Sequence, residues 1–174
     1  MQTIGNNKKS GFTVIELLVV VAIIAVLVSI VSTVVIAQVN RAKYTKAEAD
    51  WAQFRKFLVV ARAQAGKPAG QITGSYCSGC SCMFGDLRNI SESSQCFQDW
   101  KHVLDSFQEA AGDDFSGIKS MLRDPWGSPY IFDEQDEEYY PACAEDYILT
   151  VGPDGVKSTG DDRMIVLPMF RCTP

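Results

Sequence analysis

The 174-residue sequence contains a single histidine, and it lacks the local motifs on which many hydrolases and nucleotide-dependent enzymes rely. It has no Gly-x-Ser-x-Gly nucleophile elbow, no phosphate-cradling glycine loop and no His-Glu-x-x-His helix. The formal net charge of −5 argues against nucleic-acid binding, which requires a clustered basic face. These absences predict a protein that is not an enzyme and has no nucleic-acid partner.

Ionisable residues are almost absent from the stretch between Phe12 and Ala37, where Glu16 is the only one. As a helix, this run of 26 residues exceeds the ~20 residues that cross a bilayer. A lone carboxylate inside a membrane helix costs several kcal/mol unless it has a partner, so Glu16 is a candidate functional residue. Lys8 and Lys9 provide the positive flank that keeps a short N-terminus cytoplasmic.

A small residue, Gly11, lies before the apolar run, whereas an ordinary secretory signal has its cleavage site after it. Cleavage after Gly11 would lower the net charge from −5 to −7 and leave the apolar helix on the mature chain. It would also create an α-amine on Phe12, four residues before Glu16, and positions i and i+4 share a helix face. The two charges can pair within one chain or between neighbouring chains. The alternative is a signal anchor in which Glu16 is tolerated near the interface.

Lys-Lys-Ser-Gly followed by Phe-Thr-Val-Ile-Glu-Leu-Leu resembles the leader and cleavage site of the type IV pilin and pseudopilin family. The resemblance implies that a prepilin peptidase cuts after Gly11 and N-methylates Phe12. It also implies that Glu16 meets the Phe12 amine of an adjacent subunit during assembly. The implied partners are copies of this chain, the inner membrane, the prepilin peptidase, the inner-membrane assembly platform and the minor pseudopilins.

The apolar run continues into an amphipathic segment without proline or glycine from Val39 to Ala65. Its apolar stripe recurs every three or four residues, with six charged residues off the stripe. The stripe is Tyr44, Ala47, Trp51, Phe54, Leu58, Ala61 and Ala65, and the charged residues are Lys46, Glu48, Asp50, Arg55, Lys56 and Arg62. This pattern predicts one helix from Phe12 to Ala65, about 80 Å long; a short two-stranded coiled coil is the less favoured alternative.

Basic residues follow the apolar run as well as precede it, because Arg41, Lys43 and Lys46 come soon after Ala37. The charge rule is therefore nearly balanced and does not decide the orientation in the membrane. The resemblance to the pilin family decides the orientation, because it implies a single-pass protein of the inner membrane with its head outside the cytoplasm. It also implies that the protein later forms a periplasmic or surface filament.

Six cysteines follow the helix, which ends at 66–70: Cys77, Cys80, Cys82, Cys96, Cys143 and Cys172. An even number outside the cytoplasm favours disulfides, and six cysteines allow 15 pairings. The alternatives are zinc at Cys77 and Cys80, completed by Cys82, Cys96 or His102, and a redox-active pair. His102 lies in a helix expected over 98–111, and we expect it to be a surface residue of that helix.

The last third of the chain predicts an antiparallel sheet, with strands at 130–132, 147–151 and 164–167. The turn-forming run 124–130 precedes them, and we expect Trp126 and Tyr130 to anchor it against the sheet. We expect the acidic run 133–138 to form an exposed loop.

Three carboxylates, those of Asp154, Asp161 and Asp162, crowd the glycine-rich connection between the last two strands. A hard divalent cation with six to eight oxygen ligands would relieve their repulsion, whereas the alternative is a solvated acidic hairpin. Residues 124–167 resemble the head of the major pseudopilin of type II secretion. That resemblance implies that these three aspartates ligate calcium.

Together these features predict an α+β, pilin-like fold in which a long N-terminal helix packs on a small antiparallel sheet. The expected segments are a leader at 1–11, an assembly helix at 12–37 and its amphipathic continuation at 38–66. A cysteine-rich region at 67–123 and a metal-binding sheet region at 124–174 follow. The expected function is that of a structural subunit of a type II secretion pseudopilus. A type IV pilus subunit is the alternative within the family, and a membrane-anchored zinc or redox domain is the alternative of another class.

Overall fold

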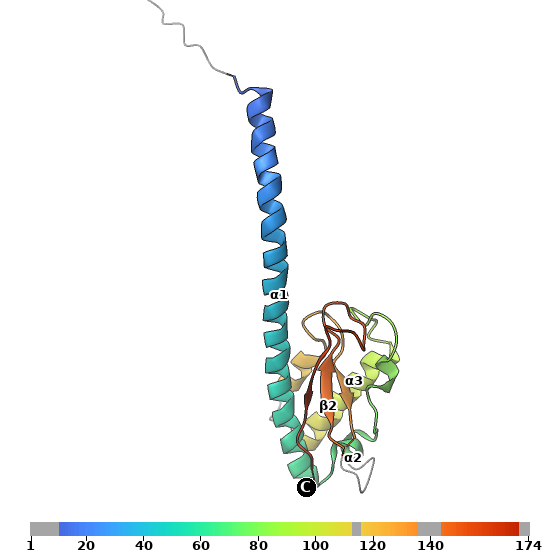
Figure 1. Cartoon of the computed structure of the whole chain (residues 1–174). Coiled ribbons are helices and arrows are strands. Elements are labelled where there is room, and N and C mark those ends of the chain that lie inside the picture. Colours follow the sequence, from blue (N-terminus) through green and yellow to red (C-terminus); the bar gives the residue numbers. More distant parts are fainter. Residues whose placement is uncertain (1–10, 113–115, 136–143, 171–174) are drawn as a thin grey trace, which may run out of the picture. The chain divides into compact units, whose positions relative to one another are not determined.

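The protein has one long helix and a small three-stranded antiparallel sheet, which confirms the predicted α+β, pilin-like class (Figure 1). The computed structural model describes residues 11–112, 116–135 and 144–170. The chain divides into two units, residues 1–40 and 41–174. The elements are α1 (Val14–Ala65), α2 (Ala69–Thr73), η1 (Cys80–Cys82), α3 (Gln95–Ala111), η2 (Ser116–Met121), β1 (Ile131–Asp133), β2 (Tyr147–Thr150) and β3 (Arg163–Val166).

Helix α1 ends where the sequence pattern predicts, because a glycine in the left-handed conformation terminates it. Gly66 has φ +64°, and its N–H donates to the carbonyl oxygen of Arg62 at 2.9 Å. Pro68 follows and cannot extend the helix. Helix α3 begins at Gln95, three residues earlier than expected, because the hydroxyl of Ser94 caps it by accepting the N–H of Phe97.

The main core of residues 41–174 lies where α1, α3 and the sheet meet, and Phe54 is at its centre. The Phe54 ring lies 5.5 Å from that of Trp100, 5.6 Å from Phe107 and 5.2 Å from Phe132. Offset and edge-on ring pairs at such distances add to the free energy gained from apolar burial. The indole N–H of Trp100 donates to the carbonyl oxygen of Met121 at 2.8 Å, so the polar atom of this buried ring is satisfied.

The sheet has the order β1-β2-β3, and β1 and β2 are covered on both faces, whereas most of β3 is exposed. Phe132 and Ile148 are paired neighbours on β1 and β2 and belong to the main core. Ile131 and Leu149 are the next pair, and because side chains alternate along a strand they point to the other face. There they join a second apolar cluster with Cys82, Leu87, Cys96 and Val151. The cysteine-rich region therefore supplies the cover of the second face.

Two charged residues of α1 that were expected off the apolar stripe are buried instead. Asp50 is 4% exposed and accepts a hydrogen bond from the hydroxyl of Tyr130 at 2.8 Å. Arg62 is 3% exposed and forms an ion pair with the fully buried Asp146. The prediction was wrong here because the partners that allow these charges to be buried come from distant segments, which helical periodicity does not reveal.

The turn before β1 is fixed, and both of its aromatic residues contact α1, while Tyr130 also belongs to the core cluster that contains Phe132 and Ile148 of the sheet. The ring of Trp126 packs on that of Tyr44 at 4.7 Å, and the Tyr130 hydroxyl reaches α1. The carboxylate of Asp124 accepts the N–H groups of Trp126 and Ser128, both at 2.9 Å. This carboxylate holds the turn from within.

The acidic run at 133–138 was expected to be an exposed loop, and the part that the structure describes is not. Asp133 belongs to β1 and is half-buried, and Glu134 is fully buried. The hydroxyls of Ser78 and Thr73 solvate the Glu134 carboxylate in place of water. Residues 136–138 lie outside the described residues.

Candidate functional site

The candidate processing and assembly site is the start of α1. Gly11, Phe12 and Thr13 precede the helix without regular structure, and nothing surrounds a Cβ built on Gly11 within 4 Å. The side chain of Phe12 is 81% exposed. The peptide bond between Gly11 and Phe12 is therefore in an uncovered stretch without regular structure, such as a peptidase can bind. Lys8 and Lys9 lie outside the described residues.

Glu16 is held by a reciprocal pair of hydrogen bonds with Thr13, the residue that caps α1. The N–H of Thr13 donates to Glu16 Oε2 at 2.8 Å, and the Thr13 hydroxyl donates to the same oxygen at 2.9 Å. In return, the N–H of Glu16 donates to the Thr13 hydroxyl at 3.3 Å. This arrangement is a capping box, which satisfies N–H groups that the first helical turn leaves unpaired.

The capping box places the Glu16 carboxylate at the backbone nitrogen that follows Phe12. An amine generated on Phe12 would therefore be close to a carboxylate that is already oriented toward the helix start. Thr13 was not among the residues predicted to be functional, although residues 13–16 carry the Thr-x-x-Glu pattern that signals a capping box.

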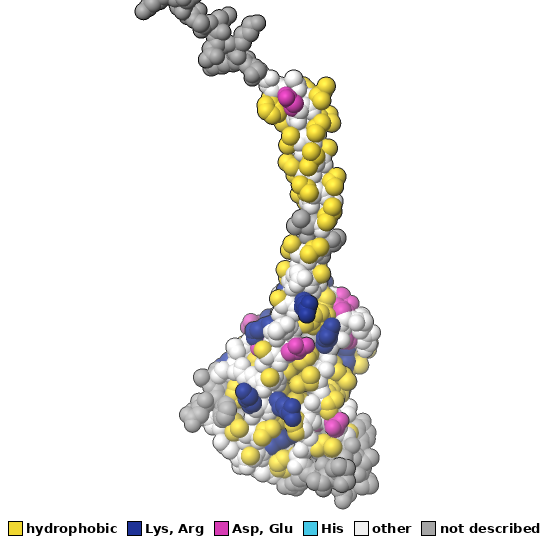
Figure 2. Space-filling model, turned by 60° about the vertical axis from the view of Figure 1, so that its left-hand side comes forward, with side chains coloured by type: hydrophobic (Ala, Val, Ile, Leu, Met, Phe, Trp, Pro, Cys, Tyr) yellow, Lys and Arg dark blue, Asp and Glu magenta, His cyan; other side chains and the backbone are white. Residues whose placement is uncertain are grey.

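An apolar surface follows Glu16 along α1. The described side chains between Val14 and Val39 are exposed, and Figure 2 shows hydrophobic side chains over the visible face of this segment. Among the described residues, α1 is the one helix that is long and apolar enough to cross a membrane. Signal sequences and buried core helices share that length and composition, but a core helix would bury these side chains within its own chain.

The family model of the prokaryotic N-terminal methylation motif matches residues 6–32. The match supports a type IV pilin-like family. It implies processing by a prepilin peptidase and assembly into a filament, and with the apolar helix it supports membrane anchoring. No curated protein and no solved structure matches the chain.

The three aspartates expected to bind a cation lie on the connection between β2 and β3 of this pilin-like chain. The Asp161 carboxylate accepts the N–H of Asp154 at 3.1 Å, and that of Asp162 accepts the N–H of Ser158 at 2.6 Å. The chain passes close to itself at Gly152, where φ is +67° and a Cβ would lie 2.6 Å from the Asp161 carbonyl oxygen. Only glycine fits this conformation and this close approach.

The charges of Asp154 and Asp161 act on the carboxylate of Asp162. Partial burial raises the pKa of Asp162, and the negative charges of Asp161 and Asp154 raise it further. Burial would also raise the pKa of Asp161, but hydrogen bonds from Thr159 and from the Asp154 N–H outweigh it and lower the value. In the described part of the chain, no three or more Asp, Glu, His or Cys side chains converge as a metal site. The oxygen donors suit calcium chemically, but their side chains would have to turn toward a common point.

The cysteine-rich region at 67–123 contacts the aspartate loop through two hydrogen bonds. The N–H of Leu87 donates to the Gly155 carbonyl oxygen at 2.8 Å, and Arg88 donates to the Pro153 carbonyl oxygen at 2.8 Å. Arg88 also pairs with Asp86, and its hydrogen bonds lower the pKa of that carboxyl to about 2. No motif in the sequence indicates this contact, because the two segments are more than sixty residues apart.

Four of the six cysteines lie in described residues, and the structure joins Cys77 to Cys80 and Cys82 to Cys96. Cys143 and Cys172 lie outside the described residues. While these two bridges are closed, their sulfur atoms are not available as thiolate ligands for zinc. His102 is exposed, and its Nε2 lies 2.9 Å from the carbonyl oxygen of Thr73 rather than near a cysteine.

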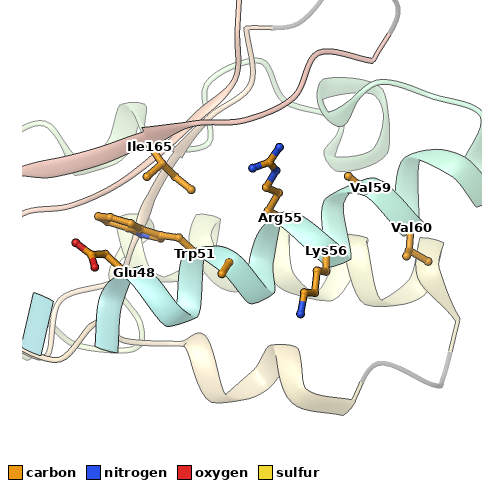
Figure 3. A pocket seen from close by; sticks show the side chains of 8 residues that line it. Glu48, Trp51, Arg55, Lys56, Val59, Val60 and Ile165 are labelled. Atoms are coloured by element: carbon orange, nitrogen blue, oxygen red, sulfur yellow. The ribbon is translucent and has the colours of Figure 1, made fainter. Parts of the chain in front are cut away.

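An open apolar groove lies on residues 41–174 between α1 and β3. Trp51, Val60 and Ile165 line it, with Ile165 projecting from β3 toward Trp51, and the charged ends of Glu48 and Lys56 lie at its margin (Figure 3). Ala52, Arg55 and Val59 complete the lining. Such a surface suits contact with another protein better than it suits acid–base chemistry.

Proposed function

We propose that this protein is a structural subunit of a type II secretion pseudopilus, which assembles through α1 into a helical filament that supports protein secretion. The observation that carries the proposal is the position of Glu16. It lies in the first turn of α1, where it forms the capping box with Thr13, and the apolar surface of the helix that follows is uncovered. One heterologous contact repeated from copy to copy produces an open filament. The protein acts by assembly, and pilin-type structural proteins are typically not enzymes.

In this proposal the peptidase cuts after Gly11 and methylates the new amine of Phe12. The mature subunit waits in the inner membrane with its head outside the cytoplasm. The assembly platform then moves it against a neighbour, where Glu16 meets the neighbour's Phe12 amine. Pairing replaces a charge that is costly in lipid with a neutral ion pair, so correct register is favoured over slipped register.

The chain offers variants that separate the charge of Glu16 from its role as a cap. Glu16→Gln keeps a side-chain acceptor for the Thr13 N–H but removes the charge, and Thr13→Val removes the hydroxyl cap but keeps the charge. We expect both variants to lose the leader normally. Only Glu16→Gln should fail to form filaments, as seen by electron microscopy of sheared cells. Normal filaments from Glu16→Gln would remove the proposed pairing.

The choice of a pseudopilus over a type IV pilus rests on the aspartate loop and on the run from Asp124 to Gly127. The cysteine-rich region and the tail from Pro168 to Pro174 depart from the compact pseudopilin pattern, so a pilus subunit is the second candidate. Deletion of the gene separates the two. A pseudopilin deletion abolishes secretion of exported enzymes, whereas a pilin deletion abolishes surface fibres, adhesion or DNA uptake and leaves secretion intact.

We also propose that calcium binds the loop through Asp154, Asp161 and Asp162. The presence of three carboxylates on one short loop, and the effect of the Asp161 and Asp154 charges on Asp162, support the proposal. A bound cation would stabilise the folded state by mass action, so chelation should lower the melting temperature by several degrees. An unchanged melt, with no calcium by elemental analysis, would contradict it. Asp161→Asn removes one proposed ligand and should lose this effect of chelation. Asp105→Asn, on the exposed side of α3, removes an equal charge and should keep it.

A further inference from the structure

The two disulfides in the described part of the chain differ in how far solvent reaches them. Cys82 and Cys96 are 1% and 5% exposed and belong to the apolar cluster under the sheet. Cys80 is exposed and Cys77 is half-buried. Disulfide exchange begins with attack of a thiolate on one sulfur atom, so access decides which bridge reacts. Of these two bridges, the one between Cys77 and Cys80 is open to attack.

The turn that carries the accessible bridge is held by hydrogen bonds that do not involve sulfur. The N–H of Cys80 donates to the carbonyl oxygen of Cys77 at 3.1 Å. Behind the turn, Glu134 accepts the N–H of Ser78 at 2.8 Å, the Ser78 hydroxyl at 2.5 Å and the Thr73 hydroxyl at 2.9 Å. None of these contacts uses a sulfur atom, so opening the S–S bond does not itself break any of them.

The same turn is also packed tightly against β1. A Cβ on Gly79 would lie 2.4 Å from Ile131 Cγ2 and 2.9 Å from the Phe132 carbonyl oxygen, so the backbone itself touches the strand. After reduction, the two thiols would therefore stay on one ordered turn. Their reclosure is intramolecular and has the high effective concentration of two groups on a short tether. We therefore expect the Cys77–Cys80 bridge to open and close while the turn and β1 stay folded.

We propose that Cys77–Cys80 is a thiol–disulfide exchange site for a dithiol reductant, such as a protein with its own C-x-x-C pair, and that Cys82–Cys96 is a permanent bridge of the fold. This function is separate from filament assembly, because no residue of the N-terminal segment takes part in it.

The exchange proceeds in two steps. A thiolate of the dithiol attacks Sγ of Cys80, the S–S bond breaks, and Cys77 leaves as a thiolate that takes up a proton. The second thiol of the reductant then attacks its own sulfur in the mixed disulfide and releases Cys80, which is protonated in turn. In total, two electrons and two protons pass to Cys77 and Cys80, and the reductant leaves as a disulfide.

Stepwise reduction of the full-length protein in detergent tests the proposal, with dithiothreitol as the dithiol. Samples are alkylated at each concentration and the cysteine-containing peptides are quantified by mass spectrometry. Cys77 and Cys80 should become alkylated at about tenfold less dithiothreitol than Cys82 and Cys96, and oxidised dithiothreitol should reclose the first bridge. The proposal is overturned if the two bridges open together, if Cys82–Cys96 opens first, or if the first bridge does not reclose.

Two single substitutions test which sulfur is attacked. Cys77→Ala leaves Cys80 as a free thiol, and Cys80→Ala leaves Cys77. The exposed Cys80 thiol should react with an aromatic disulfide reagent about tenfold faster than the Cys77 thiol. Equal rates, or a faster Cys77, would overturn the assignment of Cys80. Tryptophan fluorescence of both variants reports whether the surrounding fold is intact.

Discussion

The ion pair between Arg62 and Asp146 should be the most sensitive polar contact in the head. Arg62 comes from α1 and Asp146 directly precedes β2, and the two residues are 3% and 0% exposed. The guanidinium also donates to the carbonyl oxygen of Pro168, and the N–H of Leu167 donates to the Asp146 carbonyl oxygen at 2.8 Å. One buried pair therefore ties the helix to the beginning of β2 and to the chain that follows β3.

Asp146→Ala would leave the Arg62 guanidinium buried without its counter-ion. Removing one partner of a buried ion pair costs about 3–5 kcal/mol in the free energy of unfolding. For a domain of this size, each kcal/mol lowers the melting temperature by about 3–5 °C. The variant should therefore melt at least about 10 °C below the parent protein, as followed by tryptophan fluorescence of the full-length chain in detergent.

The matched control is Asp105→Ala, which removes an exposed ion pair with Lys101 on α3. Exposed pairs contribute about 0–1 kcal/mol, so the control should melt within about 5 °C of the parent. Replacing both buried partners, with Arg62→Met and Asp146→Leu, should recover part of the lost stability because no charge then remains unpaired. If Asp146→Ala melts like the control, the ion pair does not hold the helix to the sheet.

Three other perturbations have directions that follow from single observations. Burial raises the pKa of Glu134 from its usual 4.5 to about 7. Between these two pH values the Glu134 carboxyl is ionised in the unfolded chain but still protonated in the folded one. The free energy of unfolding should therefore fall as the pH rises from about 4.5 to 7, by up to about 3 kcal/mol. Glu134→Gln should flatten that part of the pH profile in chemical denaturation, and an unchanged slope would refute the burial argument. Gly152→Ala, at φ +67°, should cost about 1–3 kcal/mol, whereas Gly160→Ala, which meets nothing within 4 Å, should be nearly neutral; equal costs would show that the close approach is unimportant. Replacing both Cys82 and Cys96 by Ala removes a bridge with a sequence separation of 14 and should cost about 3 kcal/mol, and a denaturation midpoint equal to that of the parent would contradict it.

The regular parts of the fold were predictable because their signals are local. The run of apolar residues after Gly11, the three-and-four spacing from Ala47 to Ala61, and the glycine at 66 together predict α1 with its C-terminal boundary at Ala65. Short β-branched runs separated by turns predict every end of the three strands to within one residue. These signals depend on neighbours along the chain, so the sequence alone contains them.

The features that the sequence did not reveal depend on contacts between distant segments. Nothing near Asp50 or Arg62 indicates that Tyr130 and Asp146 allow them to be buried. Glu134 follows a strand and precedes further acidic residues, which is typical of an exposed loop, yet Ser78 provides the hydrogen bonds that replace water. The capping box is different, because Thr13 and Glu16 are three residues apart and their pattern is therefore a local signal in the sequence.

Mass spectrometry of the N-terminus of the protein purified from native membranes tests the central claim most directly. The account predicts a mature chain that begins at Phe12 with a methyl group on its α-amine. A chain that still carries Met1 and the eleven-residue leader would contradict it.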